Sequence, residues 1–130
     1  MSDYSKLAVW KKEHTLTLRL YKETEQFPRT ELSSLTSQIR RAASSIGANL
    51  AEGCGRAGDG DLHRYVSIAI GSSSELDYHL LLARDLNFLS AQIAAELRDE
   101  NGEMSRMLKG LLQAVKSRLN AQRKVVKSKT

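Results

Sequence analysis

The sequence predicts an all-α protein folded as an antiparallel, up-down-up-down four-helix bundle. Apolar residues recur at intervals of three and four along four segments, which is the helical period. The chain contains one proline, and no segment shows the strict alternation of a half-buried strand. The connections between the four segments are short, so successive helices should be antiparallel neighbours.

The first two helices are expected on either side of Pro28. The first covers about residues 6–25 and must end before Pro28, because proline disfavours helical backbone in the residue before it. The second begins after Thr30, a plausible N-cap. Its apolar series alternates steps of three and four, a pattern typical of a bundle seam. The series is Leu32, Leu35, Ile39, Ala42, Ile46, Asn49 and Gly53.

A glycine-rich corner, residues 52–60 (EGCGRAGDG), separates the second helix from the third. Asp59 or Asp61 can cap the third helix, which we expect to continue to about Leu89. The corner carries Arg56, so an anion could bind there, although a plain helix–helix turn is the simpler interpretation. The predicted seam of the third helix is Leu62, Val66, Ala69, Ser73, Leu76, Leu80 and Ala83.

The fourth helix is expected to begin after Ser90, a second capping residue. Asn101 and Gly102 could interrupt it, but the apolar period resumes in phase, so we predict one continuous helix. The last fifteen residues carry lysines and arginines and no acid. We therefore expect one bundle domain over residues 1–122 and a basic, disordered tail over residues 123–130.

Composition limits the classes of function. The chain has 130 residues and a formal net charge of +5, which is compatible with binding a polyanion. Cys54 is the only cysteine, so no disulfide can form within the chain, and a reducing cytoplasm is the expected location. No apolar run is long enough for a signal peptide or a membrane span, so we expect no membrane partner.

The second helix is rich in small residues. Folding the hairpin places residues 42–45 opposite residues 71–74, and small side chains on both would let the helices approach closely. Further small or apolar residues remain on the flanks of the second and third helices, more than a monomeric bundle needs to cover. They predict a homo-oligomer. The candidate interface residues are Ala43, Gly47, Leu50, Ile70, Leu81 and Phe88.

No catalytic, cofactor-binding or metal-binding residues are predicted. Di-iron bundles need Glu-x-x-His pairs from two helices, whereas Glu75 and His79 stand once, at a four-residue spacing. Cys54 lies near a helix C-terminus, where the dipole disfavours a thiolate, so we interpret it as a buried residue. The serines of residues 72–74 have no activating base. The sequence therefore favours a protein that is not an enzyme.

Basic residues suggest contact with RNA or DNA. The candidate contacts are Arg40, Arg41, Arg56, Lys116, Arg118, Arg123 and Lys124. Arg40 and Arg41 could instead form ion pairs with Glu75, Asp77 or an acid of a neighbouring subunit. Because Arg40 flanks the small residues of the second helix, a structural ion pair is favoured for at least one of these two arginines. Two hypotheses stay open: an oligomeric helical scaffold, and a direct RNA- or DNA-binding accessory protein.

Several motifs resemble a known family. LAVWKK, the F-P-x-x-E corner, Q-I-R-R-A-A-x-S-I, A-E-G-x-G-R and G-S-x-x-E-L occur in this order. They resemble the four-helix-bundle proteins encoded by intervening sequences within bacterial 23S rRNA genes, strongly over residues 7–89. The resemblance implies an antiparallel subunit that assembles into a pentameric ring. A distant relative, the accessory variability protein of diversity-generating retroelements, is a basic pentamer that binds nucleic acid. Gly47, Leu50 and Cys54 are small departures from the family pattern.

Overall fold

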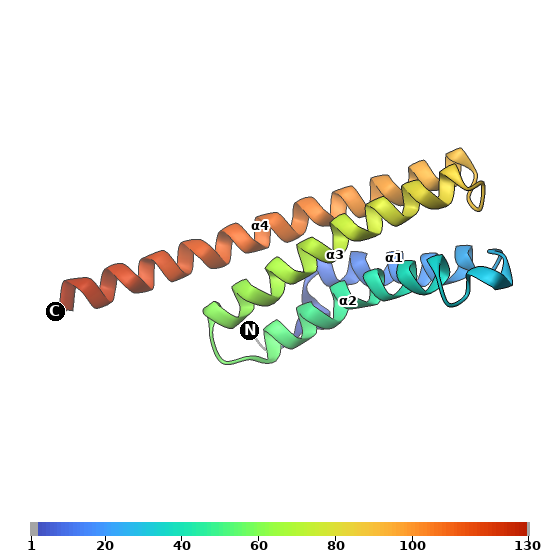
Figure 1. Ribbon diagram of the computed structural model, residues 1–130. Helices are drawn as coiled ribbons and strands as arrows, with labels where there is room; N and C mark the ends of the chain where they lie inside the picture. Colours follow the sequence, from blue (N-terminus) through green and yellow to red (C-terminus); the bar gives the residue numbers. More distant parts are fainter. Residues whose placement is uncertain (1–2, 130) are drawn as a thin grey trace.

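The computed structural model describes residues 3–129, which form four α-helices, two short 3-10 helices and no strand (Figure 1). The elements are η1 (Tyr4–Lys6), α1 (Ala8–Thr24), η2 (Arg29–Glu31), α2 (Leu35–Gly55), α3 (Asp59–Asp85) and α4 (Ala91–Lys129). α1 packs against α2 and α4, and α3 packs against the same two helices. The predicted all-α four-helix bundle is confirmed.

Contacts between neighbouring helices fix their relative direction. The Ser45 and Ser72 hydroxyl groups lie 3.1 Å apart, whereas Arg56, just after the end of α2, donates to the hydroxyl of Tyr65, which is earlier in α3. α2 and α3 are therefore antiparallel, as Figure 1 also shows for each successive pair. α3 and α4 are antiparallel as well, because residues late in α3 contact residues early in α4. The pairs are Asp77–Arg98, Ser73–Asn101 and Asp59–Arg118.

The seam predicted for α3 is the set of residues that α3 buries. The α2 seam is correct at Leu35, Ile39, Ala42, Ile46 and Gly53. Leu32 is 61% exposed, because the chain forms η2 and a turn before α2 begins. Leu50, not Asn49, occupies the fully buried position near the end of the series.

The ends of the helices show how the corners are closed. The Ser90 hydroxyl accepts a hydrogen bond from the Ile93 backbone N–H (3.1 Å), which confirms the expected cap. α3 ends at Asp85 rather than near Leu89, because Asn87 adopts a left-handed backbone with φ of 64°. The Phe88 N–H then bonds the Ala83 carbonyl, which turns the chain toward α4.

One polar pair lies in the interior between α3 and α4. The Asn101 side-chain oxygen accepts a hydrogen bond from the Ser73 hydroxyl (2.9 Å), and the Asn101 amide donates to the Ser73 carbonyl (2.9 Å). Both residues are at most 2% exposed. Because the two groups satisfy each other, an asparagine is tolerated inside a helix that runs without a break through Gly102.

α4 is longer than the other helices and projects beyond them (Figure 1). Its 39 residues span about 58 Å at the usual helical rise. The sequence predicts a disordered tail over residues 123–130, whereas the structure continues the helix through Lys129; Thr130 lies outside the described residues. No glycine or proline follows Gly110, and Val126 repeats the apolar spacing of Leu119. No helix within residues 3–129 combines the length and apolar character required to cross a bilayer.

Candidate functional site

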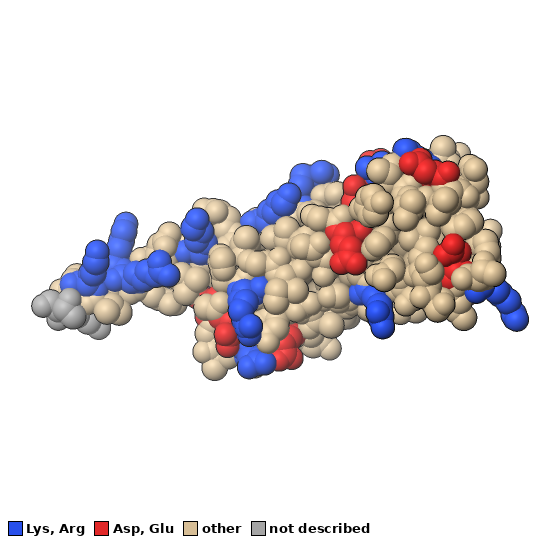
Figure 2. Space-filling view, viewed as in Figure 1, with Lys and Arg blue, Asp and Glu red and all other residues tan. Residues whose placement is uncertain are grey.

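A line of exposed cations follows α4. It consists of Lys109, Lys116, Arg123 and Lys127, which we call the basic stripe. Successive members are seven, seven and four residues apart, and these spacings return to one side of an α-helix. No acidic residue follows Glu103 in the sequence. In Figure 2, Lys and Arg side chains dominate the projecting end of α4, whereas Asp and Glu side chains lie over the bundle.

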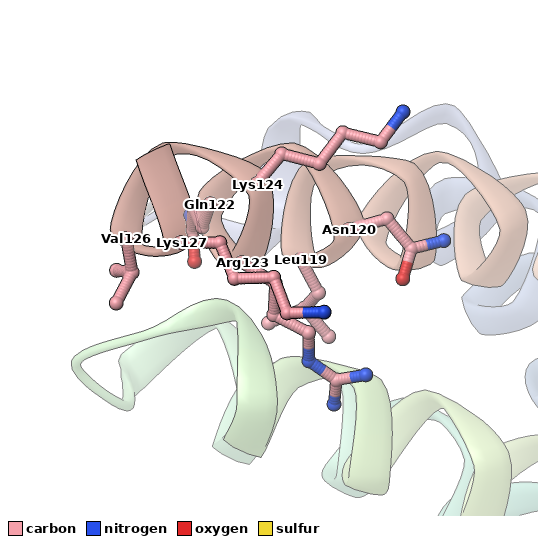
Figure 3. A pocket seen from close by; sticks show the side chains of 7 residues that line it. All are labelled: Leu119, Asn120, Gln122, Arg123, Lys124, Val126 and Lys127. Carbon is pink, nitrogen blue, oxygen red and sulfur yellow. The ribbon is translucent and has the colours of Figure 1, made fainter. Parts of the chain in front are cut away.

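The end of the basic stripe borders an open hollow of about 670 Å³ along residues 119–127. Figure 3 shows the Arg123 and Lys127 side chains extending to one side of α4, and Lys124 pointing away from them. Val126, which is 64% exposed, lies in the same stretch. Because α4 alone supplies the lining, the hollow is a trough on a helix surface rather than an enclosed pocket.

Two of the arginines predicted to contact nucleic acid have acidic partners within the chain. Arg118 donates two hydrogen bonds of 3.1 Å to Asp59, and this guanidinium lowers the pKa of the Asp59 carboxyl. Arg56 donates to Glu52 at 2.7 Å. The remaining predicted candidates on the surface are exposed: Arg41, Lys116, Arg123 and Lys124.

Arg40 has a structural role between α2 and α1. Its guanidinium donates to the Thr24 hydroxyl (3.0 Å) and the Tyr21 carbonyl (3.2 Å), and it lies over the Tyr21 ring. The predicted pairing of Arg40 with an acid of α3 is therefore wrong. Asp77 pairs instead with Arg98 of α4, through hydrogen bonds of 2.9 and 3.2 Å. The structure thus separates the arginines of α2 from the basic stripe on α4.

A buried carboxyl group lies between α1 and α2. Glu13 is 3% exposed, and its Oε1 atom accepts a hydrogen bond from the Thr17 hydroxyl (2.6 Å). Its Oε2 atom faces Gly47, where an added Cβ would lie only 2.5 Å away. Burial raises the pKa of Glu13 to about 7, against the opposing effect of hydrogen bonds from Thr17 and the Gly47 backbone.

Aromatic side chains surround this carboxyl group. The Trp10 ring stacks on His14 with centroids 4.9 Å apart, and Tyr4 meets Trp10 edge to face at 5.1 Å. With Glu13 and Tyr21 they line a cavity of about 330 Å³, which we call the α1–α2 cavity. Small residues of α2 form its opposite wall: Ser44, Gly47, Ala48 and Ala51.

The burial of Glu13 was not predicted from the sequence, because a charged residue is expected on the solvent-exposed side of a helix. A signal was present, since Glu13 lies four residues after Val9 and three before Leu16. Those spacings place it on the buried face of α1.

The family model of 23S rRNA-intervening sequence proteins matches residues 5–110. The chain belongs to this family. A crystal structure of a protein with unknown function from the S23 ribosomal protein family of Bacteroides thetaiotaomicron is similar in fold, with a TM-score of 0.71 and 22% sequence identity. The similarity covers 81% of this chain and 98% of that one. No curated protein matches the sequence.

The family match bears on the position of the basic stripe. It ends at residue 110, within α4, whereas Lys116, Arg123 and Lys127 come later in the helix. Every residue that lines the α1–α2 cavity except Tyr4 lies within the matched region, as do α1, α2 and α3. This member of the family therefore carries most of its basic stripe on a part of α4 that the family model does not cover.

The predicted oligomer interface is wrong at two residues of α2, Ala43 and Leu50. Ala43 and Leu50 are 1% and 0% exposed within a single chain, so they cannot also form an outer surface. Gly47 of this family member faces Glu13 and Trp10 of α1. At Gly47, α2 is therefore covered by α1, a neighbour that the spacing of small residues does not identify.

The α3 side of the predicted interface is partly covered as well. Ile70, Leu81 and Phe88 are each half-buried. Phe88 packs against Phe27, with ring centroids 5.6 Å apart, and Ile70 packs against the core. These three residues thus retain some accessible surface, although two of them contribute to the packing of the subunit itself.

Other groups of chemical interest are scattered. Nε2 of His79 lies 3.2 Å from Glu75, and its buried Nδ1 atom has no hydrogen-bond partner among the described residues. Cys54 is buried, and burial raises the pKa of its thiol. Within residues 3–129, no group of three or more His, Cys, Asp and Glu side chains could hold a metal ion.

Proposed function

We propose that the protein is a non-enzymatic, homo-oligomeric helical scaffold that binds the phosphates of RNA or DNA through the basic stripe of α4. The observation that carries the proposal is the projecting, exposed stripe on a helix with no acid after Glu103. Lysine and arginine contacts to phosphate release counterions, which drives association without reading bases. The name of the family refers to 23S rRNA genes and is compatible with a nucleic-acid ligand.

The composition of α4 favours recognition of the backbone over recognition of bases. The helix contains no phenylalanine, tyrosine or tryptophan on which a base could stack. Four cations on one side of a helix suit a line of phosphates. We therefore expect little sequence preference, and single-stranded RNA and duplex DNA are both tested as ligands.

Removing charge from the basic stripe should weaken binding and flatten its dependence on salt. In a Lys116→Gln/Arg123→Gln/Lys127→Gln variant, the slope of log affinity against log salt should fall by about 2 to 3, at roughly 0.7–0.9 per lost contact. Fluorescence anisotropy with labelled RNA and DNA in low to moderate salt measures both quantities.

The matched control removes three exposed lysines near or on α1, at Lys6, Lys11 and Lys22. It has the same net charge as the stripe variant and should keep most of the affinity and the slope. Equal loss in both triple variants would assign binding to overall charge and contradict the proposed stripe. Absence of any complex at low salt would contradict nucleic-acid binding altogether.

The scaffold part of the proposal rests on the outer surface of α3. Ile68 is 44% exposed and Tyr78 is 58% exposed, and Gly71 between them leaves open space around its Cα. Their spacings of three and seven residues place them on one side of the helix. Exposed apolar side chains on one helix are typical of a contact between identical subunits. The family resemblance leads us to expect five copies.

A Tyr78→Asp substitution should reduce the molar mass of the assembly and leave the helical content unchanged, because it puts a charge into the proposed subunit contact. Light scattering after size exclusion measures the mass, and circular dichroism measures the helical content. Leu18→Asp on α1 is the control, since Leu18 is 60% exposed and lies outside the α3 surface. A wild-type monomer at micromolar concentration would overturn the oligomer.

A further inference from the structure

The α1–α2 cavity combines one acid with a concentration of aromatic rings. Trp10 is the only tryptophan of the chain, and Tyr4 and Tyr21 are two of its four tyrosines; all three line the cavity. The two tyrosines are 37% and 41% exposed, so they border the opening, whereas Glu13 lies deeper at 3% exposure. The cavity therefore has an aromatic rim and an acidic interior.

The Glu13 carboxyl lacks a cationic partner among residues 3–129. The ion pairs of α1 are formed by other residues, Lys12 and Arg19, with acids of α4. The α2 residues that line the cavity carry no charge. The only histidine of the lining, His14 of α1, is stacked on Trp10. An acid buried in this way is rarely retained for stability alone.

Gly47 makes room for this arrangement. A Cβ atom at that position would lie 2.5 Å from Glu13 Oε2 and 3.6 Å from the indole nitrogen of Trp10. The close approach of α2 at a glycine therefore lets the carboxyl group and the indole occupy the same side of the helix interface.

We infer that the α1–α2 cavity binds an organic cation, with an ammonium or guanidinium group held between the Glu13 carboxylate and the rings of Trp10 and Tyr4. Aromatic faces attract cations through their quadrupole, and a nearby carboxylate supplies the full opposite charge. The chain already uses this chemistry at the edge of the site, where the Arg40 guanidinium lies 4.7 Å from the Tyr21 ring centroid. A volume of about 330 Å³ suits a small ligand.

Fluorescence of Trp10 tests the proposal directly, because no other tryptophan contributes to the signal. The probes are n-butylammonium, n-butylguanidinium and tetramethylammonium, with n-butanol as the uncharged control, at pH 8, where most of the carboxyl group is ionised. We expect a saturable change with at least one cation and none with n-butanol. A tripeptide with a central lysine and blocked ends distinguishes a protein side chain from a free amine as the source of the cation.

Glu13→Gln should weaken cation binding by about tenfold or more, because it removes the charge and keeps the size of the side chain. Glu103→Gln, which neutralises an exposed acid of α4, should leave the affinity unchanged. Tyr4→Leu is a second variant that removes an aromatic wall outside the core, and it should weaken tetramethylammonium most.

Three results would overturn the cation site: no saturable response to any cation, an equal response to n-butanol, or an unchanged affinity in Glu13→Gln. Circular dichroism on each variant confirms that the helices remain formed. The test is independent of nucleic-acid binding, since none of its variants alters the basic stripe.

Discussion

Replacing Glu13 with glutamine is expected to raise the free energy of unfolding at pH 8 by about 3 kcal/mol. The pKa of Glu13 is raised from 4.5 to about 7 in the folded protein. A difference of one in the pKa between the folded and unfolded states corresponds to about 1.4 kcal/mol in the free energy of unfolding. Glutamine keeps an oxygen that accepts the Thr17 hydrogen bond but carries no charge to be buried.

The sign of the pH dependence follows from the direction of this pKa change. The folded state favours the protonated carboxyl, so the associated stability is fully present below pH 4.5 and is lost as the pH rises through about 7. Wild type should therefore become less stable between pH 5 and pH 8, and Glu13→Gln should lose most of that slope. Urea denaturation at several pH values measures it. Glu103→Gln should keep the wild-type dependence of the free energy of unfolding on pH. If Glu13→Gln also kept it, the assignment of this dependence to Glu13 would be contradicted.

Replacing Gly47 with leucine is expected to lower the free energy of unfolding by about 2 kcal/mol. Leucine gains about 1 kcal/mol of helix propensity over glycine. The larger effect is the insertion of a bulky side chain where even a Cβ would contact Glu13 and Trp10, and such overpacking typically costs about 1–3 kcal/mol or more. Because the contact lies within the subunit, thermal stability should fall while the mass of the assembly stays unchanged.

Gly110→Leu is the control for Gly47→Leu. Gly110 is also helical, is exposed, and has open space around it, so the same substitution there should raise the melting temperature. Glu13→Ala should restore part of the stability lost in Gly47→Leu, since it removes the atoms that leucine would meet. If Gly47→Leu melted as high as wild type, the close contact between α1 and α2 at this glycine would be disproved.

The α3 seam was predictable because the spacing of apolar residues suffices for a helix packed between two neighbours. α2 was harder, because its small residues lie on two sides and the sequence does not say which helix covers each. That is why the sequence places Ala43 and Leu50 at a subunit interface, although both are buried within a single chain.

The polar contacts were less predictable than the core. Asp77 had several basic residues within reach, and only the relative positions of α3 and α4 select Arg98. Glu13 was missed because hydropathy assigns acids to the surface, whereas its spacing from Val9 and Leu16 indicated the interior. The end of α4 was expected to be disordered because its charge was given more weight than the repeat of Leu119 at Val126.

The buried pair of Ser73 and Asn101 limits how α3 and α4 can align. Apolar seams repeat every seven residues, so a shift of one heptad would preserve much of the apolar contact. Such a shift would place Asn101 opposite Val66 or Leu80, both fully buried apolar residues, and would leave its amide without a partner. One asparagine thus makes misaligned hairpins costly during folding, and the correct alignment of α4 also determines how far its cationic end extends past the bundle.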